Sequence, residues 1–167
     1  MVLLGIGQEL NGDDGAGVLV ARRLMALTRQ AHQDKNSKAI GPGVSPVPIA
    51  FTIIEAGHAP ENCTGAVRRF APDLVVLVDA AEMGEAPGTI RWLDWQETTG
   101  LSASTHTLPP YMLAQYLVGS LACRVALLGI QPAQNDIGTP LSPPVAAAVE
   151  EVSAILEELL THPACDS

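Results

Sequence analysis

The stretch that best indicates the fold is DLVVLVD, at residues 73–79. Five consecutive apolar residues between two aspartates are typical of a central strand that is covered on both faces. Apolar runs at residues 1–7 and 124–130 have the same character, and further strands are expected at residues 49–55 and 88–95. A sheet with strands of this kind needs a layer of helices on each side.

Stretches with helical periodicity separate these strands. They follow Gly15 and cover residues 59–70, 108–121 and 142–160, the last two with prolines in the first turn, where prolines are tolerated. Residues 30–48 are polar and contain glycines and prolines, which predicts a long surface loop. Because strands alternate with helices, the predicted class is a three-layer α/β/α sandwich. We expect one domain at residues 1–160 and a short tail at residues 161–167.

The composition excludes several classes of function. The 167 residues carry a net charge of −9, and such an acidic surface repels the phosphate backbone of nucleic acids. The apolar runs are shorter than a membrane span requires, and no basic region precedes the first of them, as it would in a secretory signal. Three cysteines without CxxC spacing argue against a disulfide framework or a thiolate zinc site. We therefore expect a cytoplasmic protein.

Polar residues follow several of the predicted strands. In an open α/β sheet, ligands bind outside the carboxyl ends of the strands. The candidates there are Asp14 after the first strand, Glu55 and His58 after the second, Asp79 after the third and Gln131 after the last, with His106 in a loop before a helix. Two carboxylates and an imidazole are a mixed O/N donor set, which suits a first-row divalent metal.

Structural roles remain open at the same positions. An aspartate at residue 13 or 14 also suits a helix cap, and Asp79 also suits a hydrogen bond to a loop. His58 and His106 are equally compatible with exposed histidines. The glycines at residues 5 and 7 lack the third glycine of a dinucleotide fingerprint, and no His-Glu-x-x-His helix is present. Nor does a Ser-His-Asp or Cys-His arrangement stand out, which argues against an ordinary serine, cysteine or zinc protease.

An ordered series of short motifs resembles a known family. In chain order they are GIG (5–7), DDGAG (13–17), EAGHAPEN (55–62), VDAAEMG (78–84), PGTIR (87–91), STHTLP (104–109) and LGIQP (128–132). Together they resemble the [NiFe]-hydrogenase maturation endopeptidases over residues 2–160. The resemblance is to the branch that processes formate-hydrogenlyase-type hydrogenase large subunits, in which several members carry Asp-Asp-Gly at the first motif.

The resemblance implies a fold and a set of roles. The implied fold is a mixed five-stranded sheet between helices, with strand order 2-1-3-5-4 and the fourth strand antiparallel. The family's metal-binding positions correspond to Asp14, Asp79 and His106, which would also be the catalytic residues. His58 and Gln131 would contact the substrate. His58, where small residues are common in the family, and the long segment at residues 30–48 depart from the family pattern.

The implied activity is a nickel-dependent cut. The substrate would be a [NiFe]-hydrogenase large-subunit precursor that already carries nickel, and the product would lack its C-terminal extension. Because the site offers no thiolate, we expect weak affinity for free nickel, although another divalent metal is able to occupy the site in crystals. Two alternatives are a nickel-dependent chaperone that does not cut and a nucleotide-binding α/β domain that uses the glycines at residues 5 and 7.

Overall fold

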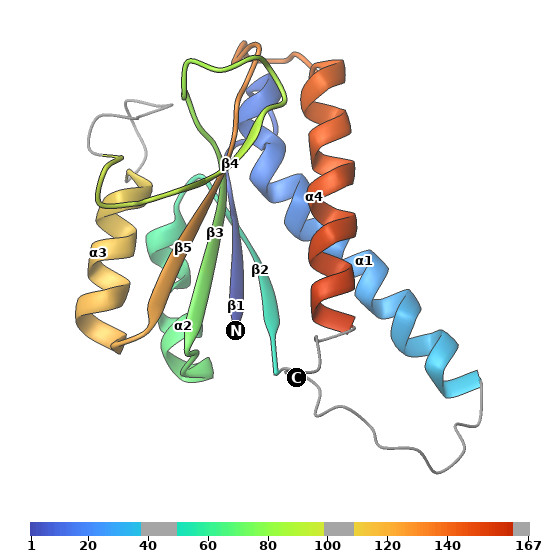
Figure 1. Ribbon diagram of the computed structural model, residues 1–167, viewed down its shortest axis with the longest axis vertical. Coiled ribbons are helices and arrows are strands. Elements are labelled where there is room, and N and C mark those ends of the chain that lie inside the picture. The colour runs from blue at the N-terminus through green and yellow to red at the C-terminus, as the bar shows by residue number, and fades with distance from the viewer. Residues whose placement is uncertain (38–49, 99–108, 162–167) are drawn as a thin grey trace, which may run out of the picture.

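A computed structural model describes residues 1–37, 50–98 and 109–161 of the chain. At its centre is one five-stranded sheet (Figure 1), formed by β1 (Val2–Ile6), β2 (Thr52–Gly57), β3 (Leu74–Ala80), β4 (Ile90–Leu93) and β5 (Arg124–Ile130). The strand order is β2-β1-β3-β5-β4. All neighbouring strands are parallel except β4, which runs antiparallel to β5. The predicted fold, strand order and antiparallel strand are confirmed.

Helices cover both faces of the sheet (Figure 1). On one face lie α1 (Ala16–Ser37) and α4 (Pro143–Thr161), and on the other lie α2 (Thr64–Phe70) and α3 (Pro110–Leu121). Alternate residues of β3 serve the two layers: Val76 packs in the core of α1 and α4, whereas Val75 and Leu77 pack in the core of α2 and α3. A strand with both faces buried needs apolar residues at every position, which explains the uninterrupted run in β3.

Most predicted boundaries differ from the structure by a few residues, and three of the differences are informative. The loop expected at residues 30–48 was wrong in its first part, because α1 continues to Ser37, while residues 38–49 lie outside the described part. Residues 30–37 are polar but contain no glycine or proline, so nothing in them interrupts a helix. The expected helix at residues 59–70 divides into a 3-10 turn, η2 (Pro60–Cys63), and α2. The third strand extends beyond residue 78 to Ala80, which places Asp79 within it.

Within the described residues, none of the helices is both long enough and apolar enough to cross a membrane. The division into one domain and a tail stays a prediction; α4 extends through Thr161, and residues 162–167 lie outside the described part.

Candidate active site

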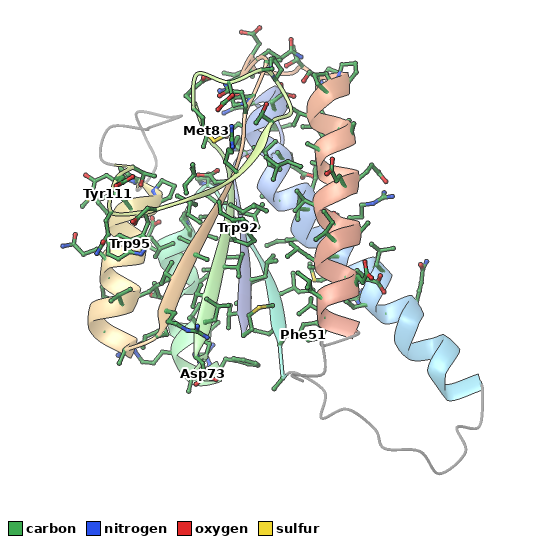
Figure 2. The ribbon with its side chains drawn as sticks, viewed as in Figure 1. Phe51, Asp73, Met83, Trp92, Trp95 and Tyr111 are labelled. Carbon is green, nitrogen blue, oxygen red and sulfur yellow. The ribbon has the colours of Figure 1, made fainter. Side chains whose placement is uncertain are left out.

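The candidate site lies at the carboxyl end of the parallel strands. Figure 2 shows Asp73 and Met83 at opposite ends of β3, so that Met83 marks the end to which the loops after β1, β3 and β5 belong. Asp79 lies one residue before the end of β3 and pairs in register with Gly129 of β5. Asp14 lies in η1, the 3-10 turn Gly12–Gly15 that links the loop after β1 to α1. The structure therefore brings both predicted carboxylates to one edge of the sheet.

Close backbone packing holds η1 and the start of α1 against the strand ends. A Cβ atom at Gly17 would overlap the carbonyl oxygens of Val78 and Ile6, and one at Gly7 would overlap the carbonyl oxygen of Asp14. Gly7 also has a φ of +127°, a conformation that other residues rarely adopt. These glycines thus bring the turn that carries Asp14 close to β3.

The two carboxylates share a buried environment. The exposed fraction is 8% for Asp14 and 7% for Asp79. Burial raises the pKa of Asp14, and the hydrogen bond that its Oδ2 accepts from the Gln8 N–H, at 2.9 Å, only partly offsets this rise. Burial, and then the nearby charge of Asp14, raise the pKa of Asp79 to about 8. The two carboxylates therefore lie close enough for the charge of Asp14 to raise the pKa of Asp79.

A small cavity lies beside Asp79. Its volume is about 20 Å³, enough for one water-sized group. It is lined, besides Asp79, by Ala80, Ala81, Leu93, Thr98, Pro110 and Leu127. The mostly apolar lining explains why the charged form of Asp79 is poorly solvated on this side.

Asp13, next to Asp14 in sequence, has a different role. Its carboxylate accepts hydrogen bonds from the Ser142 N–H and hydroxyl, at 2.6 and 2.8 Å, and from the N–H groups of Ala133 and Gln134, at 2.8 and 3.1 Å. Burial tends to raise the pKa of Asp13, but these hydrogen bonds outweigh it, and the pKa lies below its ordinary value. These hydrogen bonds do not go to the helix that follows Asp13, so its role is not the helix cap left open for residue 13 or 14. Asp13 instead ties the loop after β5 and the start of α4 to η1.

Replacing Asp13 is expected to destabilise the fold. In Asp13→Asn, one acceptor oxygen becomes an NH₂ group that faces backbone donors. The free energy of unfolding, measured by urea titration at pH 7, should fall by about 2–4 kcal/mol. Because the folded pKa is lowered, the wild-type advantage is present above the ordinary pKa of 3.8 and is lost as pH falls through the folded value. Asp136→Asn, in the exposed part of the same loop, is the control. Equal stability of the two variants would contradict this role.

Gln131 lies at the end of β5 and is 4% exposed. Its Oε1 accepts hydrogen bonds from the Met83 and Glu85 N–H groups, at 2.7 and 3.3 Å. Its Nε2 donates to Glu82 Oε2 at 2.9 Å. A second Nε2 hydrogen bond reaches the Pro132 carbonyl. The side chain thus holds the loop that follows Asp79, and its predicted contact with substrate stays a prediction.

The remaining candidates are exposed or fall outside the described residues. His58 is exposed in the turn after β2. Glu55, also exposed, forms an ion pair with Arg22 of α1 at 2.8 Å, and Arg22 pairs in addition with Glu9. No local sequence pattern indicates this triad, because Glu9 and Glu55 lie 13 and 33 residues from Arg22, on opposite sides of it in the sequence. His106 falls in residues 99–108, outside the described part. Within that part, no three His, Cys, Asp or Glu side chains form a group able to hold a metal.

Known proteins share this fold and about a third of the aligned residues. The model of the HycI hydrogenase maturation protease family matches residues 36–159. The hydrogenase 3 maturation protease of Escherichia coli K12 is 32% identical over 157 residues, which cover 93% of this chain and 88% of the relative. The crystal structure of a [NiFe] hydrogenase maturation protease from Thermococcus kodakarensis has a TM-score of 0.77 and 31% identity, over 96% of this chain and 92% of that one.

A solution structure of the Escherichia coli endopeptidase HycI is similar to the same extent. Its TM-score is 0.74 and its identity 32%, over 95% of this chain and 89% of that one. With both the family model and full-length relatives in agreement, the chain belongs to the hydrogenase maturation protease family. The predicted membership of the hydrogenase maturation endopeptidases is confirmed, and the matching family model is that of the HycI proteases.

Proposed function

We propose that this protein is a nickel-dependent endopeptidase that removes the C-terminal extension of a [NiFe]-hydrogenase large-subunit precursor after nickel insertion. Asp14, Asp79 and His106 are the residues assigned to grip the nickel that the precursor carries. The observation that carries the proposal is the convergence of two buried carboxylates, Asp14 and Asp79, at the carboxyl end of the sheet. Membership in the hydrogenase maturation protease family supports the peptidase activity.

The carboxylate pair suits a metal that arrives with its own donors. Two carboxylates and one imidazole are hard and intermediate ligands, and thiolates, which bind nickel more strongly, would come from the precursor. Asp14, Asp79 and His106 would hold the precursor through its nickel, with the scissile peptide close to the two carboxylates. Cleavage adds water across the peptide bond: the oxygen goes to the carbonyl carbon and a proton to the leaving nitrogen. The bound metal supplies polarisation of the carbonyl or of the water.

A nucleotide-binding role receives no support from the glycines of the first motif. Phosphate cradles need free space next to the glycine backbone. At Gly7 the space where a side chain would point is filled by the Asp14 carbonyl, and at Gly5 it is filled by the Gly17 carbonyl. These glycines allow η1 and α1 to pack closely on the sheet. Two functions then remain to be distinguished by experiment: a nickel-dependent endopeptidase and a nickel-dependent chaperone that does not cleave.

Cleavage is expected to depend on nickel in the precursor. Precursor loaded with nickel and precursor stripped of it are incubated with equal amounts of this protein, and intact masses are recorded. Only the loaded precursor should lose its C-terminal extension, because the metal completes its coordination in the complex. A mock incubation with Asp14→Asn controls for other proteases.

The other outcomes are equally informative. Equal cutting of both precursors would contradict the nickel dependence. Nickel-dependent binding without any change of mass would favour the non-cleaving chaperone. Tightly held stoichiometric metal in the isolated protein would indicate an ordinary metalloprotease instead.

A further inference from the structure

Two neighbouring loops at the site edge present the most exposed large apolar side chains of the described residues. Leu10, in the loop after β1, is 67% exposed, and Ile137, in the loop after β5, is 84% exposed. The loops meet at a 2.6 Å hydrogen bond from the Gly138 N–H to the Leu10 carbonyl. The Asp14 N–H donates to the carbonyl of Asn11, the residue after Leu10, at 3.2 Å, so this apolar pair lies next to the turn that carries Asp14.

Both loops are held in place by hydrogen bonds. The Asp13 N–H donates to the Gln134 carbonyl at 3.0 Å, and the Asp13 carboxylate accepts hydrogen bonds from the Ala133 and Gln134 N–H groups in the loop after β5. The Thr139 hydroxyl closes the same loop on the Asp136 carbonyl at 2.7 Å. Leu10 and Ile137 therefore project from fixed backbones, and a preorganised surface loses little conformational entropy when a partner covers it.

The charged side chains of the loops at this edge are all acidic. The loops after β1, β3 and β5, at residues 7–15, 81–89 and 131–142, contain no lysine, arginine or histidine. Their acidic residues are Glu9, Asp13, Asp14, Glu82, Glu85 and Asp136. Arg22 and Arg91, from outside these loops, pair with Glu9 and Glu85, and Asp13 and Asp14 are buried. Glu82 and Asp136 are exposed and form no ion pair with another described residue, so the border of the apolar pair keeps a net negative charge. The complementary surface on a partner is an apolar hollow bordered by basic residues.

We infer that Leu10 and Ile137 form a docking surface for the folded body of the protein substrate. They would bind an apolar patch on the substrate that has a border of basic residues. This inference rests on the proposed function, because it names the surface by which the precursor reaches the same site. Leu10 and Ile137 bind and position the substrate without contact with the reacting atoms. Docking beside the carboxylates aligns the precursor before the cut and adds specificity that a short peptide cannot supply.

The test compares two double variants on the nickel-loaded precursor. Leu10→Ser with Ile137→Ser is expected to raise KM at least about tenfold, as loss of a central apolar contact does, while kcat at saturation stays near the wild-type value. The control, Ile155→Ser with Leu159→Ser, removes two apolar side chains of α4 that are 50% and 55% exposed and should leave KM unchanged. Thermal unfolding should be the same for all three proteins, since the altered side chains are exposed.

A charge variant tests the basic border. Asp136→Lys is expected to slow association with the precursor several-fold in surface-binding measurements, because like charges then face each other. Wild-type protein that cuts the precursor, together with a Leu10→Ser, Ile137→Ser variant within twofold of its KM, would overturn the docking inference alone. Wild-type protein that does not process the precursor would instead overturn the proposed function.

Discussion

Asp79→Asn is expected to abolish cleavage and, at alkaline pH, to stabilise the fold. The activity is lost because an amide cannot supply the anionic oxygen assigned to the metal. The stability rises because the charged form of Asp79 is held in a mostly apolar environment beside Asp14. A residue whose charged form lowers the stability of the fold, but is required for activity, is typical of functional sites.

The gain in stability should depend on pH in a defined direction. The folded-state pKa of Asp79 is raised from 3.8 to about 8, so the folded protein binds more protons than the unfolded chain between these values. The contribution of protonated Asp79 to the free energy of unfolding is therefore lost as pH rises through this window. The amide of the Asp79→Asn variant has no proton to lose, so its contribution does not change. The advantage of the variant should be small at pH 4 and reach at most about 6 kcal/mol well above pH 8.

Urea titrations of both proteins at pH 4, 6 and 9 measure this advantage. Asp73→Asn, at the exposed opposite end of β3, is the matched control and should change stability by less than about 0.5 kcal/mol at each pH. An advantage of Asp79→Asn that is the same at all three pH values would show that burial and Asp14 do not hold the pKa of Asp79 high. Cleavage of the precursor by the Asp79→Asn variant would show that Asp79 is not a catalytic residue.

Gly17→Ala is expected to be among the most destabilising small substitutions in the protein. The added methyl group would overlap two backbone carbonyl oxygens, those of Val78 and Ile6, and neither can rotate away as a side chain can. Overpacking of this kind costs about 3 kcal/mol or more, which for a chain of this length lowers Tm by roughly 6–12 °C. Because α1 must shift outward, Asp14 moves relative to Asp79, and cleavage should fall with stability.

Gly119→Ala provides the matched control for this substitution. Gly119 lies within α3 and has no atom within 4 Å of the added methyl group. Alanine there should stabilise the protein by about 0.5–1 kcal/mol, since alanine favours helices more than glycine does. If Gly17→Ala unfolds at the same urea concentration as the wild type, the close approach of α1 to the strand ends is wrong.

Sequence patterns predicted most of the fold. The apolar run of β3 indicated a strand buried on both faces, and the alternation of strands with helices indicated three layers. These signals are local, since each depends on residues a few positions apart. The strand order came from the family resemblance, because periodicity within one strand does not name its neighbours. The boundary of α1 was missed because polar residues without a helix-breaking residue are compatible with both loop and helix.

The sequence by itself determined the alternation of elements, the acidic charge and the aspartates that belong to the carboxyl edge of the sheet. Only the tertiary structure decided which of the adjacent residues Asp13 and Asp14 has which role. Asp13 reaches Ser142, 129 positions away, and satisfies its charge there, whereas Asp14 lies beside Asp79. It likewise decided that Leu10 and Ile137 stand exposed together. Hydrogen bonds and charge interactions depend on distance in space, and residues far apart in sequence acquire their environments only when the chain has folded.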